Sequence, residues 1–235
     1  MTNKQTVAWV LAHPDDETFG SACTIQEVIQ SGFQAVLYVA TQGEAGKTGR
    51  LGPMSKDELA AKRIKEMQQA ANILDLSDLK QEQYPDSNLK TVDEDELIKS
   101  VTEFLNLHQP KIVVTFGERE PHPDHDAIHV ATTKAVLSDK CPSVQKLYYF
   151  VGLTNTEVKP TIRFNGSAHW DTKIQALLAH ESQAFSVERV FGDVNTLEKA
   201  PLEMKYENFV LAWEDGTHWP QKTETFLTDG LQSSN

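Results

Sequence analysis

Two short clusters of imidazole and carboxylate side chains carry the chemistry that this sequence could perform. The first cluster, HPDDE at residues 13–17, places one imidazole and three carboxylates side by side. The second, HPDHD at residues 122–126, adds two more imidazoles, and His129 follows one helical turn later. Imidazole and carboxylate are the natural ligands of a catalytic zinc site that uses no thiolate.

Each cluster also has a simpler interpretation. The helix dipole and capping favour acidic residues at a helix N-terminus, which accounts for the carboxylates of residues 13–17 but not for the histidine. The second cluster could be a polar, proline-stiffened loop that caps a helix through Asp124. Crowded carboxylates, however, repel one another and are unfavourable to desolvate, and a bound cation relieves both problems. Together the two clusters favour a metal site.

Composition argues against several classes of protein. The 235 residues suit one domain with a sizeable core, and we expect a single domain over 1–235 with a frayed tail from about 230. A net charge of −12 argues against nucleic-acid binding. No apolar run approaches the roughly 18 residues of a membrane span, and the N-terminus lacks signal-peptide proportions. We therefore expect a cytoplasmic protein with no membrane partner. The two cysteines, Cys23 and Cys141, form no cysteine-rich zinc motif.

Segments that are apolar along their whole length alternate with helix-like segments. Strands are expected at 7–12, 35–40, 111–116 and 147–151, and helices at 17–30, 55–74, 94–108, 124–137 and 171–184. This alternation predicts an α/β fold, a doubly wound, mostly parallel Rossmann-like sheet with helices on both faces. Ligands bind such sheets beyond the carboxyl ends of the strands, where both clusters fall. After about residue 155 the pattern becomes irregular.

The helix expected at 55–74 has the strongest local signals. Ser55 and Glu58 form a capping-box sequence at its start. An apolar stripe then recurs at helical spacing and predicts the face that packs on the sheet. The members of the stripe are Ala60, Ile64, Met67, Ala71 and Leu74.

The two clusters resemble those of a known enzyme family. AHPDDE at 12–17 and HPDH at 122–125 are similar to the motifs of the LmbE-like, or PIG-L, family of zinc-dependent deacetylases. Three further elements match in order: TQGEAG at 41–46, RIKE at 63–66 and HESQ at 180–183. The resemblance covers most of the chain, and several spaced motifs in the right order are a specific signal.

The resemblance implies a role for each residue of the two motifs. His13, Asp16 and His125 would bind one zinc ion and leave a coordination position open, as catalytic zinc requires. Asp15 would act as the general base. His122 would be protonated and would stabilise the oxyanion that develops on the substrate carbonyl.

Two arginines have two interpretations each. Arg63 is either one half of a solvated i,i+3 ion pair with Glu66, or a cation that faces the site and holds a substrate carboxylate or hydroxyl. Arg119 precedes the second cluster. It is either an exposed loop charge or a contact for an anionic part of the substrate.

The remaining candidates support the site less directly. Glu44 and the glycines around it would form a mobile wall of the substrate pocket. Asp124 would cap a helix or orient a ligand histidine, rather than bind the metal. His129 is expected on a helix facing the loop, in the layer around the metal ligands.

The resemblance implies hydrolysis of the acetamide of an N-acetylglucosaminyl conjugate, with a bacillithiol-type N-acetylglucosaminyl-malate deacetylase as the most similar member. A chitooligosaccharide or another N-acetylated metabolite is an alternative substrate. Two other classes stay open, a metal-dependent hydrolase of a different bond and a non-catalytic metal-binding module. The resemblance also implies assembly into several subunits.

Overall fold

The computed structural model describes residues 4–118, 120–152 and 159–231, and within them eight strands form one mixed sheet. The strands are β1 (Thr6–Leu11), β2 (Gln34–Thr41), β3 (Asp78–Tyr84), β4 (Ile112–Phe116), β5 (Lys146–Val151), β6 (Ile162–Asn165), β7 (Tyr206–Glu214) and β8 (Thr217–His218). Their order is β3-β2-β1-β4-β5-β7-β6, with β8 paired to β7. The first five are parallel, and β7 runs antiparallel to β5, β6 and β8.

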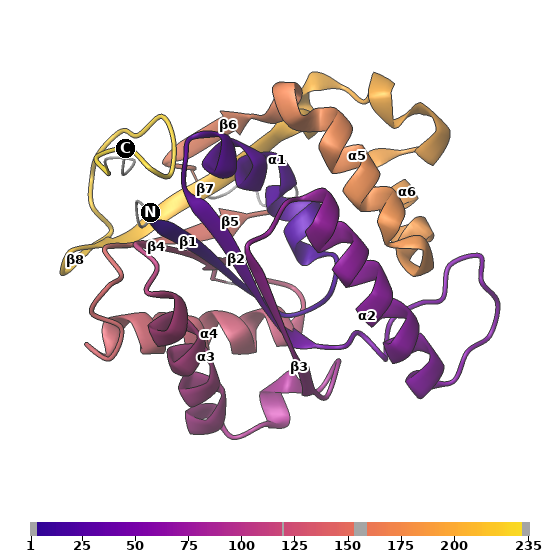
Figure 1. The fold of residues 1–235 in the computed structure, drawn as a ribbon, viewed down its shortest axis with the longest axis horizontal. Coiled ribbons are helices and arrows are strands. Elements are labelled where there is room, and N and C mark those ends of the chain that lie inside the picture. Colours follow the sequence, from indigo (N-terminus) through magenta and orange to yellow (C-terminus); the bar gives the residue numbers. More distant parts are fainter. Residues whose placement is uncertain (1–3, 119, 153–158, 232–235) are drawn as a thin grey trace.

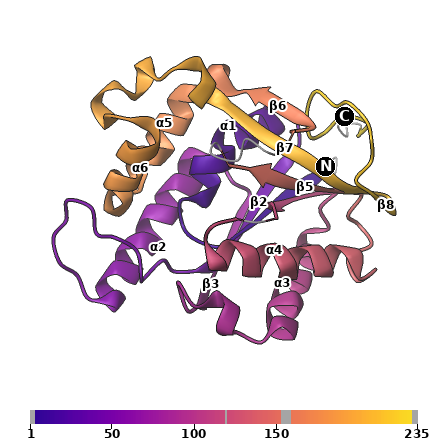
Figure 2. The same ribbon diagram turned by 180° about the vertical axis from the view of Figure 1, so that it is seen from behind.

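Helices cover both faces of this sheet. They are α1 (Asp16–Gln30), α2 (Lys56–Ile73), α3 (Glu94–His108), α4 (Pro123–Leu137), α5 (Trp170–Ala179) and α6 (Ala184–Phe191). Helices α3 and α4 lie on one face, and α1, α2, α5 and α6 lie on the other (Figures 1 and 2). The predicted doubly wound, mostly parallel α/β fold is therefore confirmed. In the described part of the chain, no helix combines the length and the apolar character needed to cross a bilayer.

The central strands are apolar because both of their faces are covered. All six residues of β1 and all five of β4 are buried. The carboxyl ends of these two strands, with those of β2 and β3, lie along the same side of the sheet. The strand order reverses between β1 and β4, so this side contains the topological switch point, where doubly wound folds bind ligands.

The predicted helix at 55–74 begins as expected, and four of the five residues of its predicted apolar stripe are buried. Ser55 and Glu58 form the full capping box at the start of α2. Within α2, however, Ile64 of the predicted apolar stripe is 38% exposed, whereas Arg63 and Glu66 are 3% exposed each. The buried face thus keeps most of the predicted stripe but extends towards Arg63 and Glu66 instead of Ile64, and it carries a cation and an anion into the interior.

Two further parts of the fold differ from expectation. Strand β3 was not predicted, because its sequence is polar and most of it is half-buried at the edge of the sheet. The helix predicted at 171–184 ends at Ala179, since His180 leaves the helical conformation with φ −84° and ψ 60°. A short 3₁₀ turn, Glu181–Gln183, then leads into α6. The irregular region after residue 155 contains β6, β7 and β8.

Candidate metal centre

His13 leaves the carboxyl end of β1 and turns one ring nitrogen towards two other predicted ligands. Its Nδ1 lies 3.3 Å from Nε2 of His125 and 3.5 Å from the carboxylate of Asp16. His125 Nε2 lies 3.4 Å from Asp16 Oδ1. A tetrahedral zinc with ligands at about 2.0–2.1 Å separates its donors by about 3.3–3.4 Å. The two imidazole nitrogens match this spacing, and Asp16 places Oδ2 near His13 and Oδ1 near His125. These three side chains are therefore candidates to hold a small cation together.

The electrostatics of the cluster point the same way. The carboxylate of Asp16 outweighs burial and raises the pKa of His125 to about 9. In turn, although burial opposes it, His125 and His13 hold the pKa of Asp16 well below its usual range. The raised pKa of His125 reports a negative potential from Asp16, and the lowered pKa of Asp16 shows that its carboxylate is stabilised by positive charge on the imidazoles. The cluster therefore pairs an anionic carboxylate with groups that favour positive charge. A divalent cation meets that requirement with more charge than a proton.

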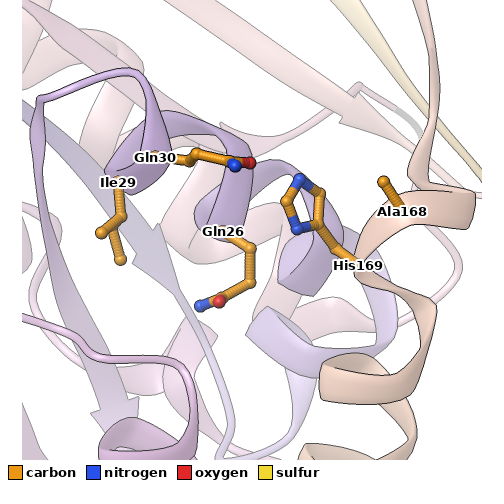
Figure 3. A pocket seen from close by; sticks show the side chains of 5 residues that line it. All are labelled: Gln26, Ile29, Gln30, Ala168 and His169. Carbon is orange, nitrogen blue, oxygen red and sulfur yellow. The ribbon is translucent and has the colours of Figure 1, made fainter.

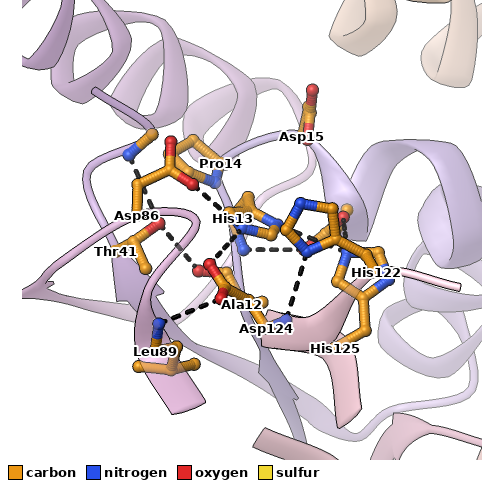
Figure 4. A network of polar contacts seen from close by, with 12 residues as sticks. Ala12, His13, Pro14, Asp15, Thr41, Asp86, Leu89, His122, Asp124 and His125 are labelled. Carbon is orange, nitrogen blue, oxygen red and sulfur yellow. Dashed lines mark hydrogen bonds and ion pairs between the residues drawn. The ribbon is translucent and has the colours of Figure 1, made fainter. Parts of the chain in front are cut away.

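The second ring nitrogen of His13 faces away from the other ligands and towards two carboxylates (Figure 4). Its Nε2 lies 3.2 Å from Asp124 Oδ2 and 3.2 Å from Asp86 Oδ1. A hydrogen on Nε2 that is shared with these oxygens leaves the Nδ1 lone pair free for a metal. Carboxylates behind a ligand histidine fix its tautomer and ring orientation.

Asp124 lies fully buried beneath His13 in the first turn of α4 and does not cap this helix. Its carboxylate accepts the backbone N–H groups of Ser87, at 2.6 Å, and Leu89, at 2.9 Å. The N-cap of α4 is His122, whose Nδ1 accepts the N–H of Asp124 at 3.2 Å. Of the two interpretations of Asp124, the structure agrees with the one that has it contact a ligand histidine.

Asp86 was missed by the sequence reasoning. It follows the end of β3, and the N–H of Ala45 donates to its Oδ2 at 2.8 Å. Its own N–H donates to Glu44 Oε1 at 2.8 Å. Burial is outweighed by the bond to His13, which lowers the pKa of Asp86 to about 2. Glu44 thus lies on the loop after β2 and holds Asp86 in place, and its contact with substrate stays a prediction.

Asp15 stands in a backbone conformation that is unfavourable for its residue type. Its φ is 110°, in the left-handed region, and a non-glycine residue there stores roughly 1–3 kcal/mol. Glu17 Oε2 accepts the N–H of Asp15 at 3.1 Å. Burial raises the pKa of the Asp15 carboxyl to about 6, against the opposing charge of Arg63. A carboxyl group with a pKa of this size is suited to take and return a proton near neutrality.

Arg63 is buried and contacts the segment that carries Asp15. Its guanidinium lies 3.2 Å from Asp15 Oδ2 and donates to the carbonyls of Gly43, at 3.0 Å, and Pro14. A Cβ on Gly43 would lie 2.2 Å from the guanidinium, so only glycine permits this approach. The alternative of a solvated ion pair with Glu66 is wrong, because the Glu66 carboxylate accepts the N–H and Oγ–H of Ser182 instead.

His122 completes the group of imidazoles. Its ring meets that of His13 edge to face at 4.7 Å between centroids, and its ligand atoms belong to one potential metal-holding group with His13 and His125. Because its Nδ1 accepts a backbone N–H, the neutral ring carries its hydrogen on Nε2. Burial and the neighbouring His13 and His125 hold the pKa of His122 below its ordinary value. Its protonated role therefore stays a prediction.

The two remaining candidates, His129 and Arg119, have different outcomes. His129 is buried on α4, and its Nδ1 lies 2.8 Å from the carbonyl oxygen of Phe116. The ring of Phe116 stacks on the ring of His125, a predicted ligand, with 3.8 Å between their centroids. His129 thus supports the residue against which a predicted ligand packs. Arg119 lies outside the described residues.

Comparison with known proteins places this geometry in a family. Residues 8–136 match the family model described as PIG-L, GlcNAc-PI de-N-acetylase. The match spans more than half of the chain and includes both clusters, β3 and Asp86. The chain belongs to the PIG-L family. The prediction of a de-N-acetylase, a hydrolase of amide C–N bonds, is confirmed at this level.

Individual relatives agree with the family. The chain is 30% identical over 192 residues to the Probable N-acetyl-alpha-D-glucosaminyl L-malate deacetylase 2 of Bacillus anthracis, covering 78% of this chain and 83% of the relative. The N,N'-diacetylchitobiose deacetylase structure from Pyrococcus horikoshii superposes with a TM-score of 0.71 at 21% identity, covering 89% of this chain and 84% of that one.

The same fold also carries different chemistry. GalB of Pseudomonas putida, a 4-carboxy-2-hydroxymuconate hydratase, superposes with a TM-score of 0.74 at 20% identity, covering 94% of this chain and 99% of GalB. Likeness at these identities shows a shared fold only. The fold therefore does not define the reaction, which depends on the residues of the site.

Proposed function

We propose that this protein hydrolyses the acetamide of an N-acetylglucosaminyl conjugate and releases acetate and the free amino sugar. The observation that carries the proposal is the cluster of His13, Asp16 and His125 beside the buried carboxyl of Asp15. The nearest polar atoms of each pair in this cluster lie 3.3–3.5 Å apart, with one Asp16 oxygen near each imidazole. Three ligands and an adjacent proton acceptor are the parts that metal-assisted amide hydrolysis needs.

Zinc is the metal that we propose for this site. His13, Asp16 and His125 would hold it, and the donor set of two imidazoles and one carboxylate suits it. When bound, zinc would polarise the acetamide carbonyl and lower the pKa of a water molecule towards neutrality. Native mass spectrometry with elemental analysis tests both the identity of the metal and the predicted assembly into several subunits.

Asp15 would move the protons of the reaction. Its carboxylate accepts a proton from the attacking water and later delivers one to the leaving amine. We assign Arg63 to this step, because its guanidinium lies 3.2 Å from the Asp15 carboxylate and so keeps that group oriented. The charge of Arg63 also limits the rise in the Asp15 pKa, which keeps the group ionised near neutrality.

His122 would stabilise the negative charge on the carbonyl oxygen. Its Nδ1 is committed to the N–H of Asp124, so Nε2 is the nitrogen left to donate to the substrate. This orientation is fixed before substrate binds, which is the feature that makes a donor effective in the transition state. A neutral Nε2–H tautomer can make the bond, whereas a protonated ring would carry a hydrogen on Nδ1 and would have to give up the bond from the N–H of Asp124.

The experiment that tests the proposal is acetate release across a panel of four compounds with zinc-loaded protein. The panel contains N-acetylglucosaminyl malate, N-acetylglucosamine, diacetylchitobiose and an N-acetyl amino acid. We expect the highest kcat/KM with N-acetylglucosaminyl malate, in line with the name of the Bacillus anthracis relative. Preference for diacetylchitobiose would move the substrate to chitooligosaccharides. Absence of acetate from all three sugars would overturn the proposal.

A further inference from the structure

A buried histidine from the far end of the chain contacts the segment that carries the proposed base. His180 follows α5, and its Nε2 lies 3.1 Å from Oε1 of Glu17, 163 residues earlier. Both residues are fully buried. The roles implied for the two metal-site motifs include none for Glu17 or His180.

Glu17 links His180 to the backbone of Asp15, because each of its two carboxylate oxygens contacts one of them. While Oε1 faces His180 and the hydroxyl of Thr18, Oε2 accepts the backbone N–H of Asp15 at 3.1 Å. That N–H belongs to the residue with φ 110°. A strained conformation of this kind persists only where the surrounding contacts hold it.

We propose that His180 is a positioning residue that acts through Glu17 to hold the backbone of Asp15 in the orientation that aims its carboxylate at the substrate. This inference rests on the proposed function, in which Asp15 is the base. His180 touches neither metal ligand nor reacting atom in this assignment. Its contribution is the geometry of the group that does.

The charges at this end of α1 require such a partner. Asp15, Asp16 and Glu17 are three consecutive acidic residues in the interior. Arg63 faces Asp15, and the imidazoles of His13 and His125 face Asp16. Glu17 has the His180 imidazole as its ring partner, and a fully buried carboxylate is unfavourable without such a donor. If His180 is lost, the Glu17 carboxylate keeps the Thr18 hydroxyl and the N–H of Asp15 but loses its imidazole partner, and we expect its side chain to shift and to weaken its bond to the N–H of Asp15.

A hydrogen-bonded turn at residues 180–183 positions His180. The N–H and Oγ–H of Ser182 donate to the Glu66 carboxylate at 2.9 and 2.6 Å, and all these groups are buried. The N–H of Gln183 returns to the carbonyl of His180 at 2.8 Å. The turn fixes the ring where its Nε2 can reach Glu17, so the donor is preorganised rather than recruited.

Three variants of His180 separate positioning from packing. His180→Leu removes the donor, His180→Gln keeps a donor at the reach of Nε2, and His180→Asn places it too short. For His180→Leu and His180→Asn we expect kcat for acetate release to fall on the order of 10²-fold, the size typical of a catalytic group displaced by about 1 Å. We expect KM and zinc content to stay within threefold, and His180→Gln to recover kcat to within about tenfold of the unmodified protein.

A matched control exists at the other end of α5. His169 pairs with Glu27 of α1 at 2.8 Å, beside a shallow surface pocket lined by Gln26 and Gln30 (Figure 3). His169→Leu removes the same type of contact between the same two helices. We expect it to leave kcat unchanged, which shows that loss of a histidine–glutamate pair between α1 and α5 is not enough to slow the reaction.

Hydrogen exchange of the Asp15 amide, followed by NMR, provides a readout that is independent of turnover. We expect this amide to lose protection in His180→Leu and His180→Asn and to keep it in His180→Gln. If His180→Leu does not fold, the Asn and Gln pair carries the comparison. Unchanged kcat and unchanged protection in His180→Asn would overturn the inference while the unmodified protein still released acetate. Absence of acetate from the unmodified protein with altered Asp15 protection would instead overturn the proposed function.

Discussion

Helices α1 and α5 are joined by one histidine–glutamate pair at each end, and the two pairs lie in opposite environments. At the N-terminus of α1, Glu17 and His180 are both fully buried. At its other end, the side chains of Glu27 and His169 are 34% and 12% exposed beside the pocket of Figure 3. The Glu27–His169 pair is therefore partly exposed to water, whereas the Glu17–His180 pair is surrounded by protein. We infer that burial, rather than the pairing itself, decides which pair can hold a strained residue such as Asp15.

The contrast extends to everything around each pair. Acidic groups crowd the start of α1, and each has a specific cationic or imidazole partner. Near Glu27 the neighbours in the pocket are the neutral amides of Gln26 and Gln30. Interactions between charges are strong and geometry-dependent in the interior, and weak and screened at the surface. Substitutions should therefore have large effects at the first end and small effects at the second.

Removing a metal ligand at the start of α1 should have the largest effect. Asp16→Ala deletes one of three donors, and we expect zinc to be lost and acetate release to fall on the order of 10³-fold or more, since the reaction then lacks both the activated water and the polarised carbonyl. Metal analysis beside the kinetic assay measures both. Ala in place of the exposed Asp126, a carboxylate in the second cluster, is the control. Stoichiometric zinc and full turnover in Asp16→Ala would refute the ligand assignment.

Replacing the proposed base should separate binding of the metal from catalysis. Asparagine tolerates the left-handed backbone of Asp15, so Asp15→Asn removes the proton acceptor without adding strain. We expect kcat to fall by about 10²–10⁴-fold, the range of general base catalysis, while zinc binds as before. Isothermal titration with zinc and single-turnover acetate release provide the two measurements. Activity within threefold of the unmodified protein would show that another group takes the proton.

How much of this end of the molecule is visible in the sequence depends on strand burial. The central strands β1 and β4 are buried along their whole length and each has a single polar residue, a threonine, so their ends, and with them His13 and the second cluster, could be placed from the sequence. Strand β3 lies at the edge and is polar, so no pattern marked it. Asp86 was missed for that reason alone. Once β3 is known, the strand-end argument that found His13 also finds Asp86.

Arg63 illustrates a different limit. Its helix was predicted correctly and most of the apolar stripe is buried, but the sequence left open whether Arg63 faces water or the site. The partners that permit its burial are carbonyls of Pro14 and Gly43, and the neighbouring Glu66 binds Ser182, 116 residues later. Such partners come together only in the folded chain, and local periodicity carries no record of them.

Weakening the support of a ligand should have an intermediate effect. Asp86→Asn exchanges a charged acceptor of the His13 Nε2 hydrogen for a neutral amide of the same shape. We expect zinc affinity to fall by about 10- to 100-fold, the usual effect of removing a carboxylate behind a ligand histidine. Competition with a chelator of known affinity measures the change. An unchanged affinity would mean that Asp124 alone orients the ring, and Asp86 would lose its assigned role.

The exposed pair should show the smallest effect of all. Glu27→Gln removes the charge that faces His169 and keeps the size of the side chain. A partly exposed pair contributes about 0–1 kcal/mol, so thermal unfolding should shift by no more than a few degrees. We expect kcat, KM and zinc affinity to stay within twofold, because the water that screens Glu27 is absent around Glu17. A loss of kcat comparable to that of His180→Leu would mean that the α1–α5 contact as a whole positions the site, and burial of the Glu17–His180 pair would no longer explain the difference.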